Sequence, residues 1–138
     1  MSDGTEGWAR VAQDDVELKE RRGGGAGSRD ISGALGTEEM KVRVWRFGPG
    51  HEMAYHRHRA QEELYHLLAG GPQVLQIHDA DVEVNDGDWV RVAKDTPRRI
   101  RNTTDRDAHW LVVAAPPGDG IMDGIRLDPE TGQEIPRT

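Results

Sequence analysis

The sequence of 138 residues contains no cysteine. This absence excludes a disulfide framework, a thiolate metal ligand and a cysteine nucleophile. Six histidines and 25 acidic residues remain as candidate metal ligands. A metal site in this chain therefore has to be built from imidazole and carboxylate groups.

Long apolar runs are also absent, and only 35% of the residues are hydrophobic. No stretch approaches the roughly 20 apolar residues that a membrane-spanning helix needs. Residues 1–7 carry neither the basic nor the apolar segment of a secretory signal. We therefore expect a cytoplasmic protein that does not associate with membranes.

Positive charge is scarce as well, with 18 basic against 25 acidic residues and a formal net charge of −7. Nucleic-acid phosphates are bound by clustered positive charge. The nearest approach to a cluster is Arg98, Arg99 and Arg101, but alternation along a strand would place Arg98 on one face and the other two on the opposite face. The composition favours a small-molecule ligand over nucleic acid.

The turn pattern indicates one all-β domain. A domain ordinarily takes about 100 to 200 residues, and turn signals recurring at intervals of about eight to twelve residues favour a sandwich or barrel. We divide the chain into an N-terminal arm with a glycine-rich linker, a barrel and a C-terminal extension, at residues 1–38, 39–117 and 118–138. Within the arm, residues 31–35 are expected to form a short strand or a segment that packs on a partner subunit.

The most informative motif contains His56 and His58, two residues apart, followed by Glu63. Alternate residues of a strand point to the same face, so the two imidazoles would project together. We expect the next strand to fold back antiparallel and to pair with the first, which would turn Glu63 toward the histidines. Two imidazoles and a carboxylate suit zinc, or non-haem iron where coordination positions stay open.

This spacing resembles the first motif of the cupin superfamily. The motif runs as glycine, five residues, His-x-His, four residues, glutamate, six residues and glycine, and here begins at Gly50 and ends at Gly70. The resemblance implies a small single-domain barrel of the cupin-2 type, a double-stranded β-helix or jelly roll with irregular N- and C-terminal arms. Glu62 is the alternative carboxylate, because the family tolerates a shorter spacer, but the step to Gly70 favours Glu63.

A second cupin motif is present in part. Gly87 and Asn102 stand in their expected places, whereas Ala93 replaces a usual proline and Asp95 a usual glycine. Arg98 stands where the superfamily places its fourth metal ligand, a histidine. A guanidinium group cannot bind a metal ion, because it has five donors and no acceptor.

Three arrangements are open at Arg98. In the first, the three ligands hold the metal alone and Arg98 binds an anionic group of the substrate. In the second, Arg98 pairs with Glu63 and no metal is bound. In the third, the strand register is displaced and another residue completes the ligand sphere, with His109 the natural candidate. His51 has the opposite parity from His56 and is expected at the rim of the site.

Tyr65 shares a face with Glu63, and we expect it to act with Arg98 in catalysis, as an acid, a base or a hydrogen-bond donor. Gln61, Asn102 and Arg98 are the expected substrate-binding residues. The resemblance implies a homodimeric cupin that binds Fe, Mn, Ni or Zn in its barrel. It would act on a small anionic molecule as a metal-dependent dioxygenase or isomerase. The competing interpretation is a non-catalytic, metal-free binding or sensor barrel.

Overall fold

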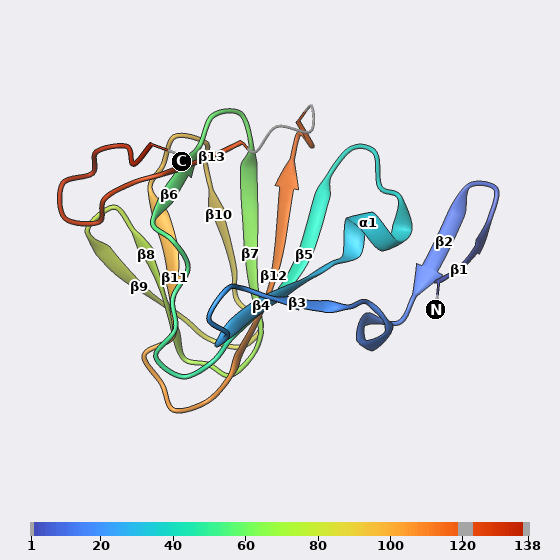
Figure 1. Cartoon of the computed structure of the whole chain (residues 1–138), viewed down its shortest axis with the longest axis horizontal. Helices are drawn as coiled ribbons and strands as arrows, with labels where there is room; N and C mark the ends of the chain where they lie inside the picture. Colours follow the sequence, from blue (N-terminus) through green and yellow to red (C-terminus); the bar gives the residue numbers. More distant parts are fainter. Residues whose placement is uncertain (1, 119–122, 137–138) are drawn as a thin grey trace.

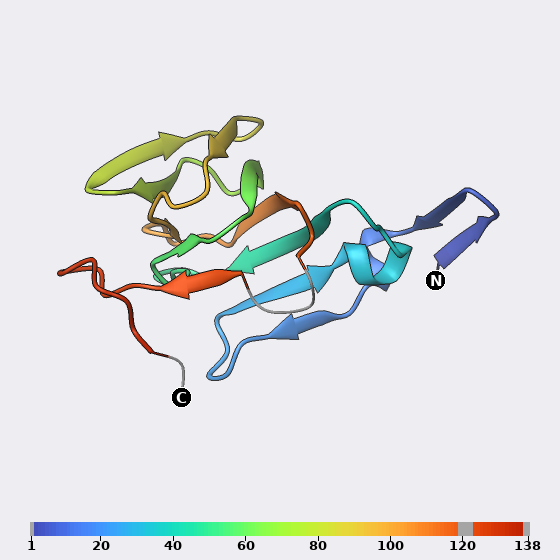
Figure 2. The same ribbon diagram turned by 90° about the horizontal axis from the view of Figure 1, so that it is seen from above.

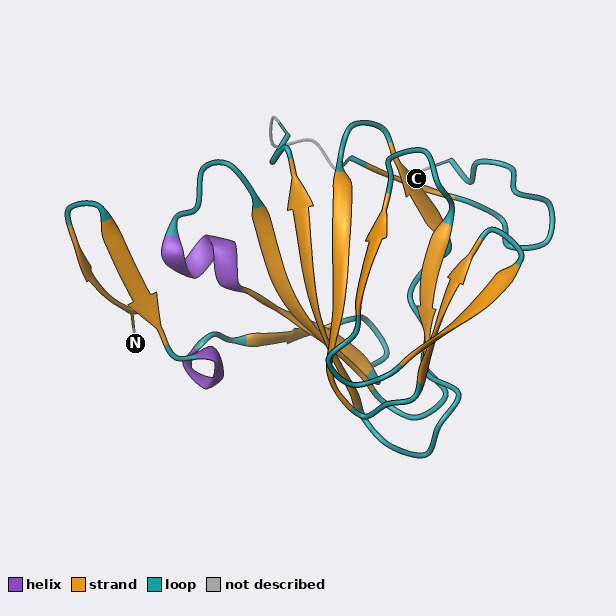
Figure 3. Ribbon diagram, turned by 180° about the vertical axis from the view of Figure 1, so that it is seen from behind, coloured by secondary structure: helices purple, strands orange, loops and turns teal. Residues whose placement is uncertain are grey.

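The computed structural model describes residues 2–118 and 123–136, and it is built almost entirely of antiparallel β-strands. Two sheets face each other and enclose the interior of a barrel (Figure 1). The secondary-structure colouring in Figure 3 shows strands throughout the body and only short helical segments near the N-terminus. The predicted all-β jelly roll is confirmed.

The larger sheet has six strands in the order β10-β7-β12-β5-β4-β3. Its central strands come from the predicted barrel, and its last two, β4 and β3, come from the N-terminal arm. The strands are β3 (Leu18–Glu20), β4 (Ala26–Asp30), β5 (Lys41–Phe47), β7 (Glu62–Ala69), β10 (Trp89–Val92) and β12 (Ala108–Ala115).

The smaller sheet has five strands in the order β13-β6-β11-β8-β9. Its edge strand β13 comes from the C-terminal extension, so both ends of the chain contribute to the sheets. The strands are β6 (His56–His58), β8 (Gln73–Ile77), β9 (Ala80–Val84), β11 (Arg98–Arg101) and β13 (Gly124–Arg126).

The core lies between the two sheets and toward one end of the barrel. Strand β12 shows why these strands form, since its residues alternate between buried and half-buried along its length. Fully buried Phe47 and Trp110 lie toward one end of β5 and β12. At the other end, Lys41 and Ala114 are paired and both line a cavity. The apolar core therefore closes one end and leaves the interior open at the other.

The first part of the chain lies outside this body. A hairpin of β1 (Ser2–Thr5) and β2 (Trp8–Val11) stands clear of the barrel (Figures 1 and 2), followed by a 3-10 turn at Gln13–Asp15. Residues 31–35 form the short helix α1 (Ile31–Leu35) and not the strand that was one of the two expectations. Its first turn is capped by the carboxylate of Asp30, which accepts from the backbone N–H of Gly33, and Gly36 ends it in the left-handed conformation. These two local caps account for a helix in place of a strand, and packing of this segment on a partner subunit stays a prediction.

In the part of the chain that the structure describes, no helix has the length and apolar character needed to cross a membrane.

Candidate metal centre and adjoining cavity

The structure brings His56, His58 and Glu63 together inside the barrel, with one potential ligand atom of each residue within 4.8 Å of the others. His58 and Glu63 are buried and His56 is half-buried. The histidines come from β6 in the smaller sheet and the glutamate from β7 in the larger one. The expected antiparallel pairing of these strands is wrong. The short connection crosses from one sheet to the other, and Glu63 meets the histidines across the barrel interior.

Each imidazole ring is oriented by a contact at its Nδ1 atom. Nδ1 of His56 lies 2.8 Å from the carbonyl oxygen of Ala54, and Nδ1 of His58 lies 3.1 Å from Oδ2 of Asp123. A carbonyl oxygen and an ionised carboxylate can only accept hydrogen bonds, so each Nδ1 carries the proton. This leaves Nε2 as the atom that each ring can offer to a metal ion, the arrangement usual for metal-bound histidine.

The charge states also suit a cation. Burial lowers the pKa of His56 to about 4, so its ring is neutral at pH 7. Burial acts to raise the pKa of Glu63, but its contact with His58 and the positive charge of Arg98 outweigh this, and the pKa is lowered. Glu63 is therefore an anion beside a neutral ligand.

The Nε2 atom of His58 lies in close contact with the carboxylate of Glu63. Nε2 of His58 is buried without a hydrogen bond, although it lies 3.2 Å from Oε1 of Glu63. A ring nitrogen and a carboxylate oxygen this close need a proton or a cation between them. The donor set therefore fits a divalent ion, which would take the place of a proton on Nε2 of His58.

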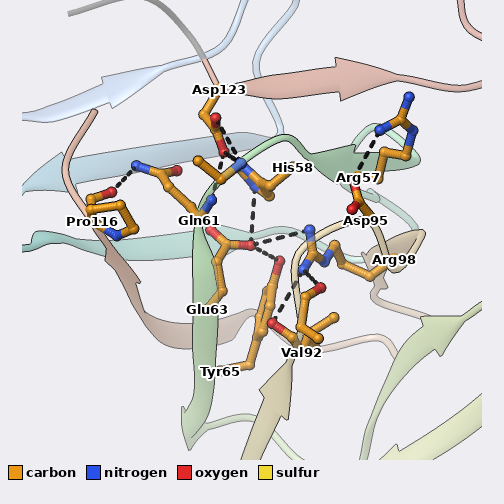
Figure 4. A network of polar contacts seen from close by, with 12 residues as sticks. Arg57, His58, Gln61, Glu63, Tyr65, Val92, Asp95, Arg98, Pro116 and Asp123 are labelled. Atoms are coloured by element: carbon orange, nitrogen blue, oxygen red, sulfur yellow. Dashed lines mark hydrogen bonds and ion pairs between the residues drawn. The ribbon is translucent and has the colours of Figure 1, made fainter. Parts of the chain in front are cut away.

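Arg98 occupies the position beside this group where the cupin pattern places a fourth ligand. It stands on β11 directly opposite His56 in register, and its side chain is fully buried. Nη2 donates to the carbonyl oxygens of Ala93 and Val92, while Nη1 lies 3.8 Å from Oε1 of Glu63 without a hydrogen bond (Figure 4). The guanidinium group thus places a positive charge beside Glu63. Arg98 is not among the residues that line the cavity, so it lies behind the site as seen from the cavity.

Asp123 is a site residue that the sequence analysis missed. Its carboxylate accepts from Nδ1 of His58 and from the backbone N–H groups of Ala60 and Gln61 (Figure 4). Burial acts to raise the pKa of Asp123, but these hydrogen bonds outweigh it and the pKa is lowered. The only sequence signal nearby is the alternation of Ile125 and Leu127, both buried, which indicates a short strand after Asp123.

The other predicted site residues are placed as follows. Tyr65 donates to Oε1 of Glu63 at 2.7 Å, and Gln61 donates to the carbonyl oxygen of Pro116 at 3.0 Å; Tyr65 and Gln61 both line the cavity. Burial, reinforced by the charge of Glu63, raises the pKa of Tyr65 well above its usual value. Asn102 lies elsewhere: its amide group donates to three backbone carbonyls, including that of Phe47, and it does not line the cavity.

The alternative ligands do not join the three-residue group. The ring of His51 lies against Gly25, and His109 lines a separate small depression outside the barrel. Glu62 is exposed and forms an ion pair with Arg91 at 2.7 Å. The arrangement with His109 as a further ligand is therefore not the one that the structure shows.

A cavity of about 480 Å³ opens beside the metal-ligand group. Its lining combines the ligands with apolar side chains and with basic residues from the N-terminal arm, β5 and β13. These basic residues are Arg21, Lys41, Arg43 and Arg126. The volume lies in the range of about 300 to 1,000 Å³ that is usual for small-molecule sites.

Comparison with known proteins places this geometry in a family. The family model described as a cupin domain matches residues 43–114, which contain all three candidate ligands and Arg98. The chain belongs to the cupin family. Among the relatives of the chain, Protein SchB of Streptomyces halstedii is 31% identical over 113 residues, covering 81% of each chain.

A second relative of this cupin is the oxalate-binding protein of Thermotoga maritima, 27% identical over 118 residues and covering 82% of this chain and 97% of that one. Solved structures with the fold of this chain include the following two. A sugar phosphate isomerase of the cupin superfamily from Silicibacter pomeroyi has a TM-score of 0.69 at 24% identity, over 77% of this chain and 74% of that one. The polyketide cyclase RemF from Streptomyces resistomycificus has a TM-score of 0.66 at 21% identity, over 77% and 78%.

Proposed function

We propose that this cupin binds one divalent metal ion through His56, His58 and Glu63 and acts on a small anionic molecule by oxygenase- or isomerase-type chemistry. The observation that carries the proposal is the set of contacts that the ring nitrogens of His56 and His58 make. Each ring has its Nδ1 proton committed to an acceptor, and the Nε2 atom of His58 is buried against Glu63 without a hydrogen bond. Iron, manganese, nickel and zinc all suit such a ligand set.

When bound, such an ion supplies Lewis-acid polarisation of a substrate oxygen or, if it is iron, a centre for dioxygen chemistry. The protein's own side chains supply orientation and protons. Asp123 fixes the ring of His58, and the hydroxyl of Tyr65 fixes the carboxylate of Glu63. Because the pKa of Tyr65 is raised, its hydroxyl stays protonated and can act as a hydrogen-bond donor or an acid beside the cavity.

The basic residues of the cavity support an anionic substrate. Four of them line it, although the whole chain carries a net charge of −7. The names of two relatives agree with this preference, since one is an oxalate-binding protein and one a sugar phosphate isomerase. From these names we infer only that the substrate of this chain is also anionic.

A second candidate function is a metal-free binding or sensor barrel, which Arg98 favours. Its guanidinium group and the carboxylate of Glu63 are both buried and lie 3.8 Å apart. A buried carboxylate needs a positive partner, and a guanidinium group can serve in place of a metal ion. In this alternative the cavity binds its ligand without turning it over.

Metal analysis separates the two functions. Protein purified without an affinity tag or chelator and dialysed against a divalent metal is expected to retain about one ion per chain. The His56→Ala, His58→Ala double variant should lose it, whereas His66→Ala, whose ring stacks on Trp89 away from the site, should keep it. Wild-type protein that takes up no metal, and that unfolds when Arg98 is replaced by methionine, would instead establish the metal-free barrel.

The homodimer and the cytoplasmic location stay predictions. Leu64, Leu68 and Trp89 are exposed apolar residues on neighbouring strands β7 and β10, which supports an interface between copies. Sedimentation equilibrium measures the molecular mass in solution and so tests the homodimer. Fractionation of cells of the native host tests the cytoplasmic location.

A further inference from the structure

Two cations are fixed on the larger sheet at a defined distance from the metal ligands. Lys41 and Arg43 lie on β5 and line the cavity. In the register of the sheet, Lys41 is opposite Ala114 of β12, which is itself opposite Glu63 of β7. Lys41 is thus two strands from Glu63, a separation of about 9.5 Å at the usual spacing between strands.

Neither cation has an acidic partner in residues 2–118 and 123–136. Among the residues that the structure describes, the side chains of Lys41 and Arg43 form no hydrogen bond and no ion pair, and both are exposed. The two acids of the cavity are already compensated, Glu63 by Tyr65 and Arg98 and Asp123 by backbone N–H groups and His58. Two cations without a partner in the described part of the chain, in a protein of net charge −7, are available to an anionic group of a ligand.

The cavity surface between these two cations and the candidate metal ligands is apolar. Strand β12 contributes two aliphatic side chains between the cations of β5 and the residues of β7, and one further aromatic and one thioether side chain lie beside them. These residues are Trp45, Met53, Val112 and Ala114. Such a surface binds the body of a hydrophobic molecule.

We propose that the cavity binds an amphipathic aromatic acid. Its anionic group lies against Lys41 and Arg43, its ring system covers the apolar surface, and an oxygen at its far end lies beside His56, His58 and Glu63. This inference rests on the proposed function for the far end alone. An oxalate-sized dianion is too short to reach both ends, and a sugar phosphate lacks the apolar body.

The test uses three matched probes: 6-hydroxy-2-naphthoate, which has oxygen groups at both ends of a fused ring; 2-naphthol, which lacks the carboxylate; and oxalate, which lacks the ring. Isothermal titration calorimetry on the metal-loaded full-length chain should show that the naphthoate binds more tightly than either of the others. The Lys41→Gln, Arg43→Gln double variant should weaken naphthoate binding by about tenfold or more and leave 2-naphthol binding unchanged. The matched control is Arg91→Gln, an exposed arginine on β10 outside the cavity lining, which should bind the naphthoate as the wild type does.

Each outcome bears on one of the two proposals. Four outcomes would overturn the proposal that the ligand is an aromatic acid. They are equal affinity for the naphthoate and 2-naphthol, unchanged naphthoate binding in the Lys41→Gln, Arg43→Gln variant, tighter binding of oxalate than of the naphthoate, and no saturable naphthoate binding. The metal content of the same samples is measured in parallel and tests the proposed function by itself. Protein that binds metal but does not prefer the naphthoate would support the metal centre and contradict the proposed ligand class. Protein that prefers the naphthoate but binds no metal would support the ligand class and contradict the metal centre. Circular dichroism confirms that the exposed substitutions leave the fold intact.

Discussion

At the scale of single residues, Arg98 sets the character of the site. A histidine in this position would supply a third imidazole, because Arg98 is opposite His56 in register and its charged end lies 3.8 Å from Oε1 of Glu63. The arginine supplies positive charge but no lone pair. The candidate centre therefore has three protein ligands and a buried cation beside them.

The substitution Arg98→His is expected to raise metal affinity at least tenfold, equivalent to about 1.4 kcal/mol, because it adds a ligand and removes a competing charge. Zinc titration against a chromophoric competitor measures the change. Arg99→His serves as the control, since Arg99 points away from the interior and forms an ion pair with Glu52. If Arg98→His and Arg99→His bind zinc equally well, Arg98 does not stand at the missing ligand position.

The residue scale also shows where sequence reasoning succeeded and where it stopped. Parity along a strand and the spacing to the next acid selected His56, His58 and Glu63, which the structure brings together. Nothing local selected Asp123, which lies 65 residues from His58 in sequence and reaches it only because β13 pairs with β6. Contacts of this kind depend on strand pairing, which a local pattern does not encode.

At the scale of elements, backbone conformation explains part of the motif. Asp95 has φ of 62°, in the left-handed region that favours glycine, and it stands where the cupin pattern usually has glycine. Gly70 and Gly87 also have positive φ, at 94° and 88°. Their surroundings differ, because a Cβ atom on Gly70 would lie 2.1 Å from the carbonyl oxygen of Asp107, whereas one on Gly87 would meet nothing within 4 Å.

Gly70→Ala is therefore expected to lower the free energy of unfolding by about 3 kcal/mol, and Gly87→Ala by about 1 kcal/mol, because only the first adds a steric overlap to the conformational cost. Denaturant unfolding followed by tryptophan fluorescence measures both values. Equal losses in the two variants would show that the close approach of Asp107 to Gly70 does not contribute.

At the scale of the whole molecule, the candidate ligands come from both sheets, which also meet through the apolar core and through polar contacts such as that of Arg98 with the carbonyl oxygen of Val92. His56 and His58 belong to the smaller sheet and Glu63 to the larger one. The bulk of the apolar core lies at the far end of the barrel, around Phe47 and Trp110. An ion shared by the ligands would thus connect the sheets at the end where the cavity separates them.

Metal is consequently expected to stabilise the folded chain, by about 2.7 kcal/mol at a free concentration one hundred times the dissociation constant. Removal of metal by a chelator should lower the melting temperature of the wild type in a calorimetric scan. The His56→Ala, His58→Ala double variant is the control and should melt at one temperature with and without metal. A wild-type protein that is equally indifferent to chelator would contradict a shared ion.

The sequence by itself determined the strand pattern, the all-β class and the three candidate ligands, because side-chain parity and turn chemistry act over a few residues. Only the tertiary structure decided that β6 and β7 lie in opposite sheets, that Asp123 orients His58, and that Arg98 lies behind the site and not in its cavity. It also placed Lys41 and Arg43 two strands from Glu63. These relations follow from the order and register of strands that are distant in sequence, and the closure of the barrel fixes them.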